Sequence, residues 1–194
     1  EKRQGVGFTL IVWESTEDID FFKNQVSFYS SELDYYNRIT HKNRLREWLT
    51  VRYILQNILN YKTPIAYDEN RRPTIPEKHM GISHSGTMVC VIVADFPCSV
   101  DIEEVSPRVS KIAHKAFTAT ELELANTHEK LTVYWGVKEA VYKLYGKGNV
   151  DFKTHMHVCP IVDFNSGVIK CHFLKKNVLL EHLNLETIGH YKLV

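Results

Sequence analysis

The sequence predicts an α+β protein built from two halves, and three features support this prediction. Apolar runs rich in β-forming residues, such as Met88–Ala94, indicate strands. Longer segments with apolar residues at helical spacing, such as His41–Asn60, indicate helices. The break at Asp95-Phe96-Pro97 separates two groups of these elements, so we expect an N-terminal half over residues 1–97 and a C-terminal half over residues 98–194.

The composition is that of an ordinary globular protein. Of 194 residues, 44% are hydrophobic and 24% are charged, and the net charge of +1 argues against a general nucleic-acid binder, which is normally more basic. No apolar run approaches the length of a membrane span, and Thr9–Trp13 is too short for a signal peptide. The four cysteines lack C-x-x-C spacing, which favours free thiols in a reducing compartment. We expect a cytoplasmic protein with no nucleic-acid or membrane partner.

The N-terminal half begins with a strand at Phe8–Trp13 and an irregular acidic stretch at Glu14–Asp20. A long helix then covers His41–Asn60, and Thr63-Pro64 ends it. The apolar stripe of this helix consists of Leu45, Trp48, Leu49, Leu55, Ile58 and Leu59. The polar segment Asp68–Lys78 contains two prolines and predicts an ordered loop or a short extended piece.

A hairpin is expected next in the chain. Met80–Ser83 predicts its first strand, His84–Gly86 its turn, and Met88–Ala94 a second strand that is buried on both faces. Backbone requirements alone account for serine and glycine in the turn, whereas His84 is also able to contact an anion. The chain has no G-x-S-x-G segment, so we expect no Ser-His-Asp triad.

The C-terminal half opens with a short strand at Ser99–Glu103 and a basic amphipathic helix at Pro107–Phe117. A further helix at Val133–Tyr145 ends at Gly146. Alternating apolar segments in the tail suggest a closing antiparallel sheet. They are Val158, Ile161-Val162, Val168–Phe173 and Tyr191–Val194.

One side of the Val133–Tyr145 helix carries groups that suit metal-assisted phosphoryl transfer. These residues are Trp135, Lys138, Glu139, Tyr142 and Lys143. A carboxylate flanked by two ammonium groups is able to bind a cation and an anion together. Taken alone, the segment is more simply a solvated helix face with a weak Glu139–Lys143 pair.

Asp101 and Glu103 add a candidate metal site. Residues two apart on a strand point to the same face, and Mg²⁺ takes few protein carboxylates, with phosphate oxygens and water completing its shell. Glu139 strengthens this hypothesis because a third carboxylate would complete a facial set. Arg46 and Arg72 are solvated charges unless they converge on one phosphate-rich ligand, to which a guanidinium offers a bidentate fork.

Several short motifs occur in the chain in a fixed order. They are Arg46-Glu47-Trp48-Leu49, Arg72-Pro73, Ile82-Ser83-His84-Ser85, Val100-Asp101-Ile102-Glu103, Phe117-Thr118-x-x-Glu121 and Trp135-x-x-Lys138-Glu139-Ala140-x-x-Lys143. With these motifs, over roughly Arg46 to Gly148, the chain resembles a 4′-phosphopantetheinyl transferase of the larger, surfactin-synthetase-activating type. Each motif alone is weak, whereas the ordered set is highly specific.

The resemblance implies a fold and a set of ligands. The fold is an intramolecular pseudo-dimer of two similar α+β halves, with coenzyme A and Mg²⁺ or Mn²⁺ in the cleft between them. Asp101, Glu103 and Glu139 would hold the metal, and Lys143 would contact the pyrophosphate. The residues that correspond to coenzyme A contacts are Arg46, Arg72, Ser83, His84, Lys138 and Lys143. The family more often has Lys where this chain has Arg72.

The activity that the resemblance implies is that of a holo-[acyl-carrier-protein] synthase. It transfers the 4′-phosphopantetheine arm of coenzyme A to a serine of an apo acyl- or peptidyl-carrier protein and releases adenosine 3′,5′-bisphosphate. Glu139, directly or through a metal-bound water, would be the base for the carrier serine, and Lys143 would stabilise or protonate the leaving oxygen. Two alternatives stay open: a non-catalytic paralogue that binds coenzyme A or a carrier protein, and another Mg²⁺-dependent phosphoryl transferase or nuclease.

The predicted Pro107–Phe117 helix offers a candidate surface for the carrier protein. Arg108, Lys111 and Lys115 fall on one of its sides, opposite Ile112. Carrier proteins in this family's pathways are typically acidic around the modified serine, so this basic side would dock them. A solvated helix face without a partner is the alternative. We expect the chain to act as a monomer.

Overall fold

The computed structural model describes all of residues 1–194. The chain divides into two compact units, Glu1–Ser99 and Val100–Val194, which we call unit 1 and unit 2. Helices and antiparallel sheets occur together in each unit, so the predicted α+β class is confirmed. All four cysteines are free thiols. None of the helices combines the length and the apolar character that crossing a membrane requires.

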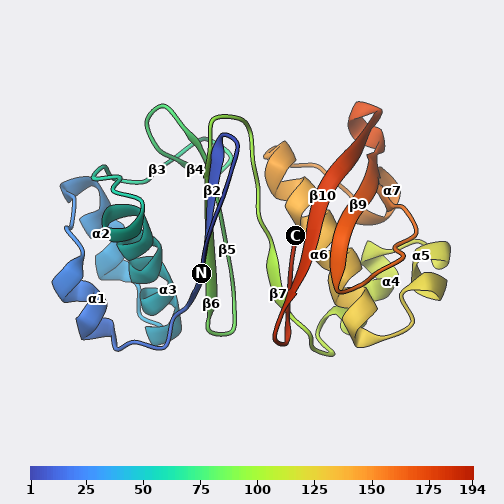
Figure 1. The fold of residues 1–194 in the computed structure, drawn as a ribbon, viewed down its shortest axis with the longest axis horizontal. Helices are drawn as coiled ribbons and strands as arrows, with labels where there is room; N and C mark the ends of the chain where they lie inside the picture. The colour runs from blue at the N-terminus through green and yellow to red at the C-terminus, as the bar shows by residue number, and fades with distance from the viewer. The chain divides into compact units, whose positions relative to one another are not determined.

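Unit 1 is built on an antiparallel sheet with the strand order β1-β2-β6-β5 (Figure 1). Its strands are β1 (Lys2–Gly5), β2 (Phe8–Glu14), β5 (His79–Ser85) and β6 (Met88–Ala94). Every residue of β6 except Ile92 is buried, as the continuous apolar run predicts. Two short strands, β3 (Ala66–Tyr67) and β4 (Pro73–Thr74), pair within the segment predicted as a loop or short extended piece.

Three helices lie on one face of this sheet (Figure 1). They are α1 (Ile19–Gln25), α2 (Ser30–Arg38) and α3 (Lys42–Tyr53), and α3 continues into a π-helical turn, η1 (Ile54–Ile58). The predicted helix at His41–Asn60 is therefore present. The sequence does not predict α1 and α2, because helices of 7 and 9 residues are too short for apolar periodicity to identify them.

The turn of the β5–β6 hairpin begins two positions later than the sequence predicts. His84 and Ser85 belong to β5 and are paired with β6, so the two turn residues are Gly86 and Thr87. Gly86 has a φ of 58°, which is the left-handed conformation that a two-residue hairpin turn requires. The prediction that His84 lies at the tip of the turn is therefore wrong. Sheet pairing fixes its backbone instead.

Unit 2 contains an antiparallel sheet with the strand order β7-β11-β10-β9-β8. Its strands are β7 (Ile102–Glu104), β8 (Met156–Val158), β9 (Ser166–Phe173), β10 (Val178–Ile188) and β11 (Tyr191–Leu193). The sequence does not predict β10, because an irregularity between Leu180 and Leu183 interrupts the alternation of its side chains. Ile161-Val162 is not in a strand, and Val162 is fully exposed, so that part of the prediction is wrong.

The helices of unit 2 are grouped around α6 (His128–Tyr145). The other helical segments are η2 (Val109–Lys111), α4 (Ala113–Ala116), α5 (Ala119–Leu124), α7 (Phe152–His155) and η3 (Leu174–Lys176). The predicted helix at Pro107–Phe117 is thus broken into η2 and α4, and Ile112 is exposed rather than on its apolar side. Arg108, Lys111 and Lys115 are exposed as expected.

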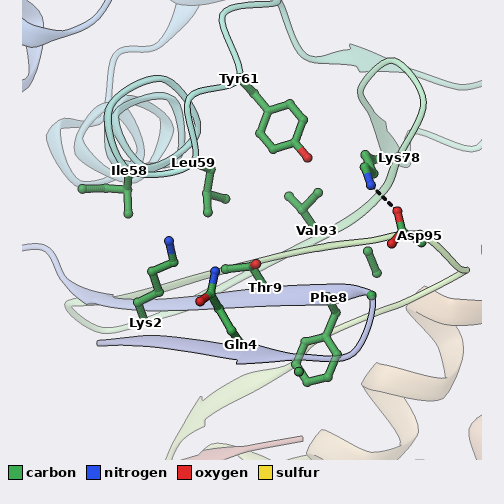
Figure 2. A pocket seen from close by; sticks show the side chains of 13 residues that line it. Lys2, Gln4, Phe8, Thr9, Ile58, Leu59, Tyr61, Lys78, Val93 and Asp95 are labelled. Atoms are coloured by element: carbon green, nitrogen blue, oxygen red, sulfur yellow. Dashed lines mark hydrogen bonds and ion pairs between the residues drawn. The ribbon is translucent and has the colours of Figure 1, made fainter.

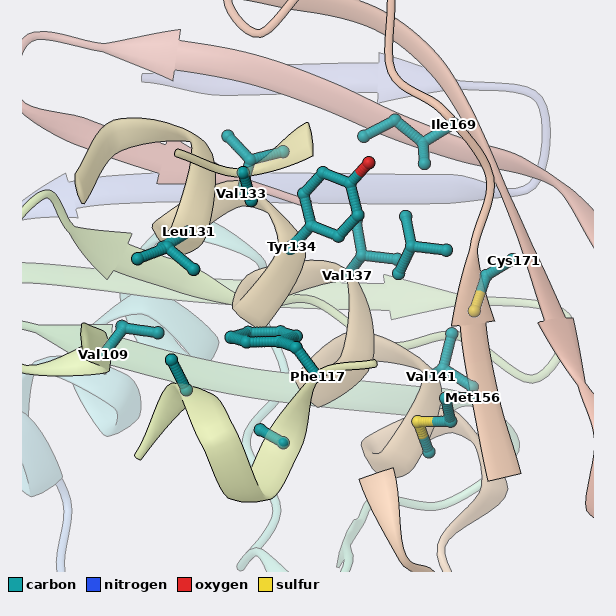
Figure 3. Close-up of a cluster of buried hydrophobic side chains, with 14 of the residues drawn as sticks. Val109, Phe117, Leu131, Val133, Tyr134, Val137, Val141, Met156, Ile169 and Cys171 are labelled. Atoms are coloured by element: carbon teal, nitrogen blue, oxygen red, sulfur yellow. The ribbon is translucent and has the colours of Figure 1, made fainter. Parts of the chain in front are cut away.

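Helix α6 lies within a cluster of buried apolar side chains (Figure 3). Tyr134 and Val137 of α6 are fully buried in it, together with Phe117 and Cys171 from other elements. The rings of Phe117 and Tyr134 meet edge to face with centroids 6.4 Å apart. Each such side chain contributes roughly 1.5–3 kcal/mol through burial. The helix ends at Gly146, whose φ of 63° confirms the predicted stop.

Candidate functional site

Asp101 and Lys143 form the central contact of the candidate site in unit 2. The backbone N–H and C=O of Asp101 both bond Val194, at 2.7 and 2.8 Å, which fixes Asp101 at the start of β7. The Asp101 side chain is only 3% exposed, and its Oδ1 accepts a hydrogen bond from Lys143 Nζ at 2.6 Å. Lys143 comes from α6. The structure therefore brings together two predicted residues that are far apart in the sequence.

A second contact joins the same two elements. Glu103 lies on β7, and its Oε1 accepts a hydrogen bond from Trp135 Nε1 of α6 at 3.2 Å. Trp135 and Glu139 are four residues apart on α6 and so lie on one side of the helix. Glu103 and Glu139, two of the three predicted carboxylates, are therefore presented by facing parts of β7 and α6.

Glu139 is half-buried on α6 and responds to the charges around it. Burial, followed by the negative charge of Asp101, raises the pKa of Glu139 from 4.5 to about 7, while Lys143 opposes the shift and Glu103 adds to it. A carboxyl group with this pKa exchanges its proton near neutral pH. It is therefore suited to act as a general acid or base.

The raised pKa of Glu139 predicts a pH dependence of stability. The folded state keeps the Glu139 proton between pH 4.5 and about 7, whereas the unfolded state loses it, so the unfolding free energy should fall as the pH rises through this window. The expected loss is roughly 2–3 kcal/mol. Urea unfolding of wild type and Glu139→Gln between pH 4 and 8 measures it, and the variant should show the smaller decline. If the unfolding free energies of the two proteins changed with pH in parallel, this would contradict the raised pKa of Glu139.

Gly136 allows α6 to approach Asp101 closely. A Cβ atom at this position would lie 3.4 Å from Asp101 Oδ2 and 3.4 Å from Val194 Cγ2, which is ordinary van der Waals contact. We expect Gly136→Ala to stay within about 1 kcal/mol of wild-type stability, because helix propensity offsets the tighter packing. Gly136→Val should lose roughly 1–3 kcal/mol through overpacking. Urea unfolding compares the two, and equal stabilities would argue against close packing here.

Lys138 does not lie with Glu139 and Lys143. Its side chain is fully buried, and its Nζ donates to Glu121 Oε2 at 2.8 Å, Ala116 O at 2.9 Å and Phe152 O at 3.0 Å. These three acceptors use all three donors of the ammonium group. The predicted contact between Lys138 and coenzyme A therefore does not fit its position. The helical pattern places Lys138 on the polar side, but charge pairing with Glu121 draws it into the core.

His84 in unit 1 contacts two residues of α3. Its Nε2 lies 2.8 Å from Arg44 Nη1, and its Nδ1 lies 3.3 Å from Glu47 Oε2. Arg44 Nη1 also donates to Glu47 Oε2 at 3.2 Å. From the sequence, we assign the ligand contact to Arg46 and do not single out Arg44. The i,i+3 spacing of Arg44 and Glu47 is the signal that could have identified the pair.

The remaining predicted residues of unit 1 are placed differently from one another. Arg46 is half-buried on α3, and Ser83 is buried within β5. Arg72 is exposed, and its Nε donates to Asp68 Oδ2 at 2.7 Å. Asp68 Oδ1 also accepts the backbone N–H of Arg72 at 2.9 Å, so this pair closes a local turn.

Two hollows lie on unit 1. A shallow one at the start of α3 is lined by His41, Lys42, Asn43, Arg44 and Glu47. Helix N-termini favour anions, and Lys42 and Arg44 add positive charge. A second hollow lies between the β1–β2 hairpin, the end of η1 and the Lys78–Asp95 ion pair (Figure 2). It contains none of the predicted site residues.

The three carboxylates of unit 2, Asp101, Glu103 and Glu139, suit Mg²⁺ in their chemistry. Three carboxylates, one with a raised pKa caused partly by the other two, are a donor set whose repulsion a divalent cation would relieve. No group of three or more His, Cys, Asp or Glu side chains is arranged here to hold an ion directly. Asp101 is bonded to Lys143 and Glu103 to Trp135. The donor chemistry fits Mg²⁺, and side-chain rotations would be needed for binding.

Comparison with known proteins identifies the same region. Residues 97–191 match the family model of the 4′-phosphopantetheinyl transferase superfamily. 4′-Phosphopantetheinyl transferase psf-1 of Bacillus pumilus is 41% identical over 80 residues, which is 38% of this chain and 34% of that protein. 4′-Phosphopantetheinyl transferase Sfp of Bacillus subtilis (strain 168) is 37% identical over 82 residues, 39% of this chain and 37% of that protein.

A third relative, 4′-phosphopantetheinyl transferase ffp of Bacillus subtilis, is 35% identical over 82 residues. Each of these matches spans only about a third of the relative's own length. The matched family region contains Asp101, Glu103, Glu139 and Lys143, which are the residues that the structure gathers on β7 and α6. The resemblance seen in the sequence is thereby confirmed over residues 97–191, the part of the chain that matches the 4′-phosphopantetheinyl transferase superfamily.

Proposed function

We propose that this protein transfers the 4′-phosphopantetheine group of coenzyme A to a serine hydroxyl of an apo acyl- or peptidyl-carrier protein, releasing adenosine 3′,5′-bisphosphate. The observation that carries the proposal is the Asp101–Lys143 contact beside Glu139, inside the region that matches the transferase superfamily. This arrangement places the Lys143 ammonium, which is able to bind a phosphate, near Glu139, which exchanges a proton near neutral pH.

Each residue of the unit 2 site has a distinct role in this proposal. Glu139 accepts the proton of the carrier serine, since a pKa of about 7 leaves a large share of the carboxyl group ionised at neutral pH. Lys143 binds the pyrophosphate and stabilises the leaving oxygen. Asp101 orients Lys143 through the 2.6 Å contact until the phosphate arrives. The serine attacks phosphorus directly, so no covalent enzyme intermediate forms.

Asp101, Glu103 and Glu139 are the residues that would hold Mg²⁺, or Mn²⁺ in its place. When bound, the ion neutralises negative charge on the pyrophosphate. Its arrival would also relieve the repulsion that Asp101 and Glu103 exert on Glu139. We also propose that residues 1–97 and 98–194 are the two similar halves of an intramolecular pseudo-dimer.

Unit 1 supplies contacts to the phosphates of coenzyme A in this proposal. His84 and Arg44 are joined at 2.8 Å beside the shallow hollow at the start of α3. Arg46 lies on α3 with Arg44, and Ser83 lies on β5 with His84. Arg72 provides a further positive charge from its turn. Glu47 holds His84 in place at 3.3 Å.

Substitution of these arginines is expected to weaken coenzyme A binding more than it slows the transfer step. Arg44→Ala, Arg46→Ala and Arg72→Ala should each raise KM for coenzyme A by about tenfold with kcat within about threefold, because contacts to remote phosphates are made in both the ground and the transition state. Initial rates with coenzyme A and dephospho-coenzyme A measure this. Arg38→Ala, at the end of α2, is the control. An unchanged KM would remove that arginine from the binding site.

The proposal is tested with a panel of apo-carrier proteins incubated with coenzyme A and Mg²⁺, each product being measured by intact mass. A mass gain of one phosphopantetheine group on at least one carrier supports the transferase, and the rate ratios define the partner class. Coenzyme A binding without a mass gain on any carrier would support the non-catalytic paralogue instead.

A further inference from the structure

We propose that the buried Lys138–Glu121 pair is a positioning device that sets the rotation of α6 about its axis and thereby holds Glu139 and Lys143 against Asp101. This inference rests on the proposed transferase function of the same site. Lys138 directly precedes Glu139, and successive residues of an α-helix are about 100° apart around its axis. A fixed Lys138 therefore fixes the direction in which Glu139 projects.

The Lys138 ammonium is held from three directions. Glu121 belongs to α5, Ala116 ends α4 and Phe152 begins α7, and their oxygens accept from Nζ at 2.8, 2.9 and 3.0 Å respectively. The Phe117 ring adds a cation–π contact, with its centroid 5.0 Å from Nζ. Helix α6 is thus tied to three helical segments through one atom.

Glu121 is itself fixed independently of α6. Thr118 and Glu121 form a capping box at the start of α5, in which Glu121 Oε2 accepts the Thr118 N–H at 2.8 Å. Glu121 Oε1 accepts the N–H of Val158 on β8 at 3.0 Å. The carboxylate therefore has one position, defined by α5 and β8, and Lys138 must reach it. This explains why Phe117-Thr118-x-x-Glu121 accompanies the α6 motif although it supplies no ligand.

Apolar burial alone leaves the rotation of α6 weakly defined. Side chains are buried around most of the helix, namely Leu131, Thr132, Val133, Tyr134, Val137, Lys138, Ala140 and Val141. A small rotation exchanges one buried apolar group for another, whereas a buried ammonium is satisfied only where its acceptors are. A rotation of about 20° moves a side chain about 5 Å from the axis by about 2 Å. Misplacement by about 1 Å is able to cost about 100-fold in rate.

The test replaces Lys138 with methionine, which keeps the length of the side chain and removes its charge. In the folded fraction, we expect kcat for transfer to fall about 100-fold while KM for coenzyme A changes less than about threefold, because the phosphate contacts of unit 1 are untouched. Lys138→Arg keeps the charge and should recover part of the loss. A kcat within about threefold of wild type in Lys138→Met would overturn the inference.

Lys192→Met is the matched control. Lys192 is equally buried, at 1% exposure, and its Nζ donates to Glu129, Phe164 O and Thr187. Its partner Glu129 lies in the first turn of α6 and is 48% exposed, whereas Glu121 is 4% exposed, so the loss of Lys192 should lower stability by less than the loss of Lys138 and leave kcat of the folded protein within about threefold of wild type. Equal falls in kcat for the two variants would mean that destabilisation alone is responsible, which also overturns the inference.

A crystal structure of Lys138→Met gives a readout that needs no turnover. The inference requires the contact between Lys143 Nζ and Asp101 Oδ1 to be lost, and its retention at 2.6 Å would contradict it. If Lys138→Met does not fold, Glu121→Gln is measured in the same way, since it keeps the shape and removes the partner charge. Wild-type protein without transferase activity would speak against the proposed function, while the crystal structure would still decide the role of Lys138.

Discussion

Replacement of Glu139 by glutamine is expected to lower kcat for phosphopantetheinyl transfer by a factor of about 10³ and to leave the fold intact. Glutamine keeps the size of the side chain but cannot accept the serine proton or carry a negative charge. Asp101→Ala should have a similar effect, because it removes the carboxylate that holds Lys143 at 2.6 Å. Initial rates at saturating coenzyme A and carrier protein measure both losses, with circular dichroism as the check on folding.

The control for this pair is Glu123→Gln, which neutralises an exposed carboxylate on α5 of the same unit. Its rate should equal that of wild type, because surface charges away from the site contribute little. If Glu139→Gln kept more than about a tenth of the wild-type rate, Glu139 would be neither the base nor an essential metal ligand.

Removal of the charge of Arg52 is expected to destabilise the protein by about 3–5 kcal/mol, because it leaves the buried side chain of Glu32 without its partner. Arg52 Nη2 donates to Glu32 Oε1 at 2.7 Å, and both side chains are 4% exposed. The Arg52 guanidinium also stacks on the Trp48 ring, 3.4 Å from its centroid. Denaturant unfolding of Arg52→Met, followed by tryptophan fluorescence, measures the loss.

An exposed ion pair provides the comparison. Lys170 and Glu181 are joined at 2.9 Å, with side chains 54% and 49% exposed. Lys170→Met should cost less than about 1 kcal/mol, because solvent screens the pair. Similar losses of stability for Arg52→Met and Lys170→Met would show that burial does not determine how much the Arg52–Glu32 pair stabilises the protein.

The strongest patterns in the sequence correspond to real elements. Met88–Ala94 is apolar without interruption and forms β6, one of the two inner strands of its sheet, while α6 combines helical periodicity with a glycine stop. Asp101 and Glu103 are two residues apart, so the local geometry of an extended chain indicates that they lie near each other. Their meeting with α6 could be predicted only through the resemblance, because no local rule relates β7 to a helix more than twenty residues later.

Long-range charge pairing accounts for the misplaced site residues. Lys138 lies on the polar side of the helical pattern, but its partner Glu121 is buried in another helix and holds it in the core at 2.8 Å. His84 of β5 lies 2.8 Å from Arg44, a contact between residues 40 positions apart that no local pattern predicts. In place of the predicted Pro107–Phe117 helix, the structure has two short segments, η2 and α4, separated at the exposed Ile112.

The most direct test of the transferase assignment measures both products of one reaction. Wild-type protein, coenzyme A, Mg²⁺ and the preferred apo-carrier are incubated together, and phosphopantetheine on the carrier serine and free adenosine 3′,5′-bisphosphate are quantified by mass spectrometry. The proposed mechanism requires equal amounts of the two products, with Glu139→Gln producing neither at a comparable rate. Adenosine 3′,5′-bisphosphate without modified carrier, or wild-type protein that forms no product with any carrier, would contradict it.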